Sequence, residues 1–215
     1  MKLYEYRGDY FSRKLAVAAN YAGVDLERIY MELSELKTPE FLKKNPNGKL
    51  PVLETPEGVH IFESNAILRY IARLDKTKGL YGSDILEESH VDQWLDWFVN
   101  EVSEHYFPYI APYLGWFGDK KSSKAAESKL RPALKILDDH LKLNTFVAGN
   151  KVTIADINMM AELFIGFRFL WDEKWRKSIP NITRWFETLV AQEPFAKEYG
   201  RIMMCQKPLE IPNLQ

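Results

Sequence analysis

The sequence predicts an α/β domain followed by an all-helical domain. Over the first 80 residues, short apolar runs of strand type alternate with helical patterns in the order βαβαββα. From about residue 85 onward, every segment has helical periodicity. We therefore expect one domain over residues 1–76 and a second over residues 85–215, with the linker at the Gly-rich, charged residues 75–84.

Local patterns justify each element of the first domain. "KLYEY" and "LERIYM" are the first two predicted strands, and the helix between them ends at Gly23, a residue typical of helix C-caps. Thr38 is the expected cap of a short helix that has Pro39 as its first residue. The next predicted elements are a hairpin made of residues 51–55 and 59–63 and a helix over residues 64–74.

The second domain is predicted to consist of amphipathic helices. After the first, Pro108 and Pro112 are expected to interrupt the helical pattern. In the third, Thr153 and Asp156 have the spacing of a capping box, with a carboxylate in place of the usual Glu. The predicted helices cover residues 85–107, 122–142, 152–170 and 179–192.

Composition excludes several classes of protein. The 29 basic and 30 acidic residues give a net charge of -1, so no strong overall field draws the chain to nucleic acid or to a membrane. A single cysteine, Cys205, excludes an internal disulfide framework. No apolar segment approaches the length that spans a bilayer, and we expect a cytoplasmic protein.

The histidines and glycines do not form a familiar cofactor motif. His60, His90, His105 and His140 lack the spacing of metal ligands, so no metal is expected. No Gly-rich phosphate loop is present, and nucleotide-exchange chemistry is therefore not expected in this chain.

The stretch "GKLPVLET" places Pro51 at the start of an apolar strand. A cis Leu50–Pro51 bond would turn the backbone N–H and C=O of Leu50 outward, where an extended peptide can pair with them as an added strand. An ordinary trans proline at a strand start is the alternative, since cis bonds are only about 5% of X-Pro bonds. The local pattern alone leaves both open.

The stretch "FESNA" also has two interpretations. Ser64 or Asn65 can cap the helix that follows, with Glu63 as a solvated carboxylate. Alternatively, Ser64 and its N–H hold a ligand carboxylate at the helix start while Glu63 meets an ammonium group. Together these two contacts would recognise the amino-acid end of a ligand.

The order βαβαββα, the pair "NPNGKLPVLET" and "FESNAI", and the later "VTIADI" resemble the glutathione transferase superfamily. The resemblance covers nearly the whole chain. It implies a thioredoxin-like N-terminal domain and an all-helical glutathione transferase C-terminal domain.

More narrowly, residues 38–74, "NTFVAGNKVTIADI" and "IPNITRWFETLVAQEPFAKEYG" resemble the gamma-subunit family of the eukaryotic translation elongation factor 1B complex. This resemblance implies an anchoring subunit whose partners are the nucleotide-exchange subunits, with a homodimer expected. The alternative is an active glutathione transferase that conjugates glutathione to electrophiles.

The superfamily resemblance also implies a glutathione site. Leu50, before Pro51, would pair with the cysteinyl part of the tripeptide, and Lys49 lies where a side chain can reach the glycine carboxylate. Glu63 and Ser64 match the positions that bind the γ-glutamyl end.

The position that activates the sulfur is the one that departs from the family pattern. Asp9 stands where a serine is expected, and its charge would oppose a neighbouring thiolate. Ser12, at the start of the first helix, is the remaining candidate for that catalytic role, although a first-turn cap is its more common role.

Overall fold

The computed structural model describes residues 1–212 and contains the predicted four-stranded sheet. Its strands lie in the order β2-β1-β3-β4, with β1 parallel to β2 and the other pairs antiparallel. In the register of the two central strands, Leu3 lies opposite Leu53, and both side chains are fully buried. The strands are β1 (Lys2–Glu5), β2 (Glu27–Tyr30), β3 (Val52–Glu54) and β4 (His60–Phe62).

Three α-helices complete this half of the molecule, and the end of the first and the start of the second agree with the predicted signals. Gly23 follows the first helix with a φ of 67°, a left-handed conformation that glycine adopts at little cost. The Thr38 hydroxyl accepts a hydrogen bond from the N–H of Phe41 and so caps the second. The helices are α1 (Arg13–Ala22), α2 (Pro39–Lys44) and α3 (Ser64–Leu74), with a 3-10 turn at Leu33–Lys37.

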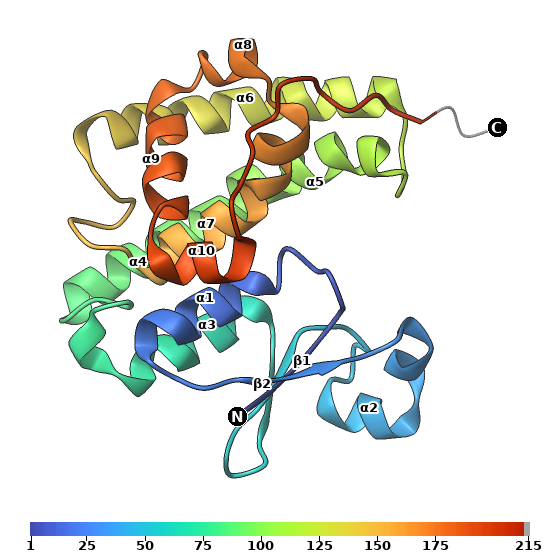
Figure 1. Ribbon diagram of the computed structural model, residues 1–215, viewed down its shortest axis with the longest axis vertical. Helices are drawn as coiled ribbons and strands as arrows, with labels where there is room; N and C mark the ends of the chain where they lie inside the picture. Colours follow the sequence, from blue (N-terminus) through green and yellow to red (C-terminus); the bar gives the residue numbers. More distant parts are fainter. Residues whose placement is uncertain (213–215) are drawn as a thin grey trace.

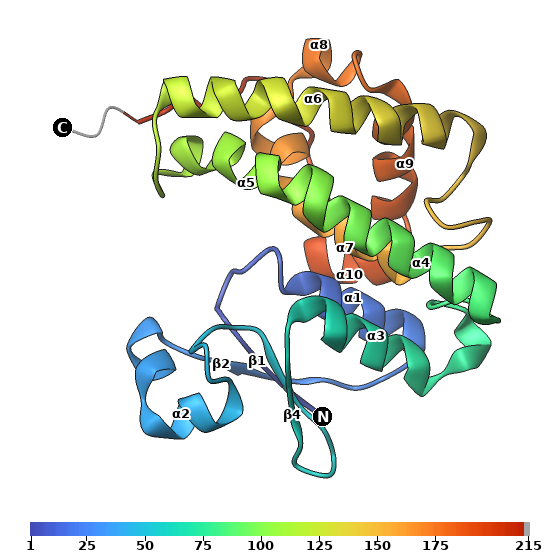
Figure 2. The ribbon, with the colours of Figure 1, turned by 180° about the vertical axis from the view of Figure 1, so that it is seen from behind.

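The remaining regular structure of the described chain is helical, as predicted. Figures 1 and 2 show these helices packed together on one side of α1 and α3. The helices are α4 (Ile85–Trp97), α5 (Glu104–Ile110), α6 (Lys120–Leu143), α7 (Ile154–Ile165), α8 (Glu173–Arg176), α9 (Pro180–Val190) and α10 (Glu193–Tyr199). Short 3-10 turns cover Lys76–Lys78 and Ala111–Leu114.

Two predicted helices differ in detail from the structure. A π-helical segment at Phe98–Ser103 separates α4 from α5, and another at Gly166–Leu170 extends α7. Pro108, expected to interrupt the helix, lies inside α5 instead. The buried Tyr106 and Tyr109 of α5 favour the helical conformation there, because tertiary packing outweighs local propensity.

The capping box predicted at the start of α7 is confirmed. The carboxylate of Asp156 accepts hydrogen bonds from the N–H and hydroxyl of Thr153, from the N–H of Val147 and from the indole of Trp185. Asp156 is fully buried. Burial raises its pKa, although the four hydrogen bonds act in the opposite direction.

One hydrophobic core runs through both halves of the described chain. Helices α1 and α3 lie side by side on one face of the sheet and pack against α7, while α10 packs on α1 (Figure 1). The opposite face is covered by a smaller cluster around Leu36, Phe41 and Val52. Within residues 1–212, no helix is both long and apolar enough to cross a membrane.

Candidate functional site

A cavity of about 320 Å³ lies where the starts of α1 and α3 and the turn before β3 meet α5 and α7 of the helical half. It brings together four of the residues predicted from the sequence, although these come from three separate segments. Its lining residues are Asp9, Phe11, Ser12, Lys14, Leu50, Pro51, Ser64, Phe107 and Glu162.

The turn before β3 presents free backbone groups. The Leu50–Pro51 peptide bond is cis. Neither the N–H nor the C=O of Leu50 has a hydrogen-bond partner within residues 1–212. The turn is held from behind, since the side-chain amide of the buried Asn45 donates to the C=O of Lys49 at 2.7 Å. An extended peptide can therefore pair with Leu50 along this edge.

The start of α3 is an uncapped helix end. Glu63 precedes the helix with a φ of 68°, and it is the one non-glycine residue with a positive φ among those described. No side chain caps α3, so neither Ser64 nor Asn65 serves as the cap that one interpretation of the sequence suggested. The free N–H groups and the helix dipole favour a carboxylate at this point.

The start of α1 is organised by Asp9. Its carboxylate accepts hydrogen bonds from the N–H of Phe11 at 2.9 Å, from the N–H of Ser12 at 3.2 Å and from the Ser12 hydroxyl. Ser12 occupies the N-cap position of α1, as its alternative role implied, but its side chain makes no capping hydrogen bond. Because the hydroxyl donates its single proton to Asp9, it has no proton left to donate to a bound sulfur.

Two predicted residues lie outside this cavity. The side chains of Lys49 and Glu63 are exposed, and neither lines it. A ligand that extends beyond the cavity along β3 or along the start of α3 would meet them, as the γ-glutamyl and glycine ends of a tripeptide do in the predicted arrangement.

Sequence reasoning missed a buried ion pair in the cavity wall. The Nζ of Lys14 lies 2.5 Å from Oδ1 of Asn158, 3.4 Å from Oδ1 of Asn65 and 3.8 Å from Oε1 of Glu162. The hydroxyl of Ser103 donates to the other oxygen of Glu162 at 2.5 Å. The signal was available, because a lysine in the first turn of the mostly apolar helix "RKLAVAANYA" falls on its buried side.

A second cavity, of about 480 Å³, adjoins the first and shares Asp9 and Phe11 with it. Its wall is mostly apolar and aromatic. Trp116 lines this cavity, whereas Tyr106 and Tyr109 of α5 are buried in the core. An apolar group attached to a ligand in the first cavity has room here.

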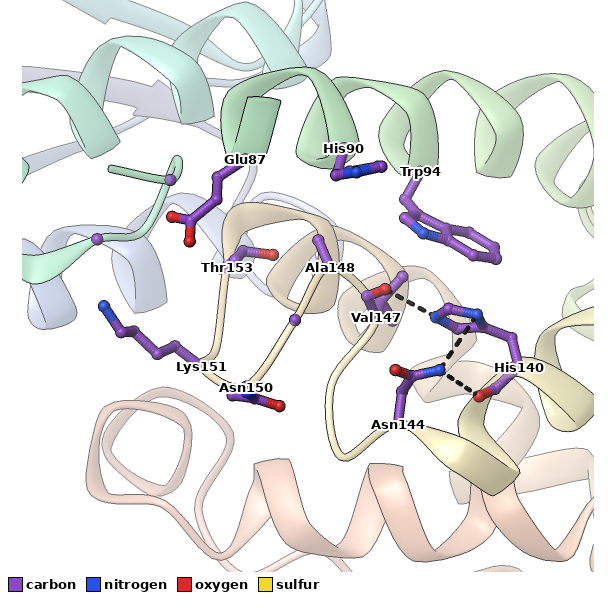
Figure 3. A pocket seen from close by; sticks show the side chains of 13 residues that line it. Glu87, His90, Trp94, His140, Asn144, Val147, Ala148, Asn150, Lys151 and Thr153 are labelled. Carbon is purple, nitrogen blue, oxygen red and sulfur yellow. Dashed lines mark hydrogen bonds between the residues drawn. The ribbon is translucent and has the colours of Figure 1, made fainter. Parts of the chain in front are cut away.

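A third cavity, of about 430 Å³, lies away from these two, between α4, the end of α6 and the loop before α7 (Figure 3). The Nε2 of His140 lies 2.9 Å from the C=O of Val147, and the amide of Asn144 donates to the C=O of His140 at 2.9 Å. His140 thus lies in the cavity wall and is hydrogen-bonded to the loop before α7. Residues 1–212 contain no group of three His, Cys, Asp or Glu residues placed to hold a metal ion.

Comparison with known proteins identifies the family of both halves. The model of the glutathione S-transferase N-terminal domain matches residues 1–73, and that of the C-terminal domain matches residues 95–193. The chain belongs to the glutathione transferase superfamily. This membership, together with the observed sheet and helices, confirms the predicted fold class of a thioredoxin-like domain followed by an all-helical domain.

Solved structures of glutathione transferases superpose on nearly the whole chain. A glutathione S-transferase-I bound with the ligand lactoylglutathione is 27% identical, with a TM-score of 0.78 over 91% of this chain and 96% of that one. A delta-class glutathione transferase from Nilaparvata lugens is 29% identical, with a TM-score of 0.80 over 92% of this chain and 91% of that one.

Within the superfamily, the narrower resemblance is confirmed as well. A probable elongation factor 1-gamma 2 of Arabidopsis thaliana is 40% identical over 98% of this chain and 52% of its own length. Elongation factor 1-gamma 3 of Oryza sativa subsp. japonica is 42% identical over 94% of this chain and 48% of its own length. The chain thus spans about half the length of these relatives.

Proposed function

We propose that this chain is the glutathione transferase-like part of a translation elongation factor 1 gamma subunit in the cytoplasm. In this role it anchors the nucleotide-exchange subunits of the elongation factor 1B complex and forms a homodimer. The similarity to elongation factor 1-gamma proteins over 98% of the chain is the observation that carries this proposal.

We also propose that the chain retains a glutathione site. Leu50 offers two free backbone groups, and the uncapped start of α3 at Ser64 offers N–H donors to a carboxylate. Glu63 and Lys49 would meet the charged ends of the tripeptide at the rim. Neighbours of the same fold have been solved with lactoylglutathione and with oxidized glutathione, which supports a ligand of this class.

An active glutathione transferase is the second candidate, and the two adjoining cavities favour it. One cavity suits the tripeptide, and its apolar neighbour suits an electrophile. The hydrogen bond from Ser12 to Asp9 opposes it, because the chain then lacks a hydroxyl proton at the sulfur. Anchoring therefore remains the function that we propose first.

The anchoring function is tested by association with a partner. The purified chain is mixed at micromolar concentration with the N-terminal segment of an exchange-factor subunit and analysed by size-exclusion chromatography with light scattering. We expect one peak with the combined mass of the segment and a dimer of this chain. The delta-class transferase of Nilaparvata lugens, which shares the fold, is the control that should stay separate. Separate elution of this chain and the segment would overturn the anchoring proposal.

A further inference from the structure

Lys14 is a buried cation at a position that does not favour one. Its side chain lines the smallest of the three cavities described above, and the residue is only 4% exposed. Lysine is among the residues least often buried in proteins. It also lies in the first turn of α1, where the helix dipole disfavours a positive charge. Burial removes water from the ammonium group and so disfavours its charged form, which lowers the pKa of Lys14.

The polar cluster around Lys14 contains one buried donor that has no partner within residues 1–212. An ammonium group carries three N–H donors. Two of them donate to Oδ1 of Asn158 at 2.5 Å and to Oδ1 of Asn65 at 3.4 Å, and Glu162 is the ionic partner at 3.8 Å. The Nδ2 of Asn158 is buried and has no partner within residues 1–212. The cluster is thus incompletely satisfied at the wall of a cavity, where a ligand can complete it.

The charges around the cavity indicate where an anionic ligand atom can lie in it. Asp9 and Glu162 are carboxylates in the wall, and Lys14 is the one cation among its lining residues. An anionic ligand atom would be repelled by both carboxylates unless it lay on the Lys14 side. The Ser12 hydroxyl cannot help, because its proton is donated to Asp9.

We propose that Lys14 faces the sulfur of a glutathione bound in this cavity and that its ammonium stabilises the thiolate form. This inference rests on the glutathione site proposed above, in which Leu50 holds the cysteinyl part. The ammonium takes the place of the hydroxyl that transferases of this type use. The thiol proton passes to solvent, and no covalent bond to the protein forms.

The acidity of the bound thiol then depends on every charged group near Lys14. Glu162 from α7 and Asp9 before α1 are the acidic ones, while Asn65 of α3, Asn158 of α7 and Ser103 of the π segment are uncharged. Lys14 lowers the pKa of the bound thiol, and the two carboxylates raise it.

The test compares two glutamine variants of α1. Lys14→Gln removes the cation from the cavity, and Arg13→Gln removes an equal charge from the neighbouring residue, whose guanidinium donates outside the cavity to the C=O of Glu198. The pKa of bound glutathione is read from the ultraviolet absorbance of the thiolate, and affinities for glutathione and S-methylglutathione come from calorimetry at pH 8.

We expect Lys14→Gln to raise the pKa of the bound thiol by about one unit, on the order of the effect of one nearby charge. It should weaken glutathione binding roughly tenfold and leave S-methylglutathione, whose sulfur does not ionise, within about threefold. Arg13→Gln should change neither quantity.

The outcomes separate this inference from the function that it rests on. If the wild-type chain binds neither ligand, the glutathione site and the role of Lys14 are both wrong, while the anchoring test is unaffected. If the wild type binds glutathione and Lys14→Gln leaves the thiol pKa unchanged, only the role of Lys14 is wrong. Should Lys14→Gln fail to fold, the wild type alone decides: the pKa of its bound thiol must lie below that of free glutathione, and an equal or higher value overturns the proposal.

Discussion

At the scale of single residues, Asp9 decides what the Ser12 hydroxyl does. A carboxylate that accepts two backbone N–H groups and a hydroxyl closes the turn before α1, so its role is structural. The same contact takes up the proton that a thiol-activating serine would donate. Because Asp9 binds the Ser12 hydroxyl, the residue at position 9 decides whether that hydroxyl can donate to a bound thiol.

Replacing Ser12 by Ala tests this assignment. We expect the free energy of unfolding to fall by about 1.5–3 kcal/mol, since a buried hydrogen bond to a charged group is lost. Turnover of glutathione with a chloronitrobenzene should be the same in both proteins, because the Ser12 hydroxyl donates to Asp9 and takes no part in it. Stability comes from urea unfolding and turnover from absorbance at saturating glutathione.

The control for this substitution is Ser128→Ala, at an exposed position of α6, which should change stability by less than about 0.5 kcal/mol. Turnover by the wild type above the uncatalysed rate that disappears in Ser12→Ala would show that Ser12 is catalytic after all. The enzyme hypothesis would then replace our assignment.

At the scale of elements, the central strands are joined by a polar cluster at the end of β3. Glu54 accepts hydrogen bonds from the Tyr4 hydroxyl at 2.6 Å and from Lys2 at 3.2 Å, both on β1. These contacts, that of Tyr4 first, lower the pKa of Glu54 to about 2. Burial, with the contact to Glu54 next, raises the pKa of Tyr4 to about 12.

The lowered pKa of Glu54 predicts how the stability of the sheet depends on pH. Because the folded pKa lies below the ordinary value of 4.5, the stabilisation is present above pH 4.5 and is lost as the pH falls toward about 2. Glu54→Gln should therefore cost on the order of 1–2 kcal/mol at pH 7 and almost nothing at pH 2, measured by urea unfolding at each pH. Glu27→Gln, exposed on β2, is the control without such a change. A cost of Glu54→Gln that is equal at both pH values would contradict this account.

At the scale of the whole molecule, polar contacts tie the sheet to the C-terminal helices. The guanidinium of Arg28, on β2, pairs with Glu5 of β1 and with Glu198 of α10, the latter at 2.8 Å. Asn20 of α1 donates to the other oxygen of Glu198 at 3.0 Å. These contacts lie beside the continuous core, so both halves are expected to unfold together.

Removing the charge of Glu198 tests that coupling. Glu198→Gln should lower the free energy of unfolding by about 1–2 kcal/mol, because a partly buried pair loses one partner. Glu173→Gln breaks a pair with Lys177 that is about 70% exposed, so its effect on stability should be much smaller than that of Glu198→Gln. Urea unfolding followed by circular dichroism gives both values and shows whether one transition remains. Equal costs for the two variants would contradict a structural role for Glu198.

The sequence by itself determined the order of elements, because strand and helix periodicity, the cap at Thr38, the glycine at position 23 and the box at Thr153 are local signals. Motif resemblance was enough to place the chain in its superfamily and to select Leu50 and Ser64. These signals act over a few residues along the chain, and the sequence displays them directly.

Only the tertiary structure decided how the site is built. It brings Ser12, Leu50 and Ser64 around one cavity while leaving Lys49 and Glu63 exposed, and it aligns Lys14 with Glu162, 148 residues further along the chain. It also shows that the Ser12 hydroxyl donates its hydrogen bond to the Asp9 carboxylate. Burial, charge pairing and the direction of a hydrogen bond depend on neighbours that only folding brings together, and therefore local patterns do not reveal them.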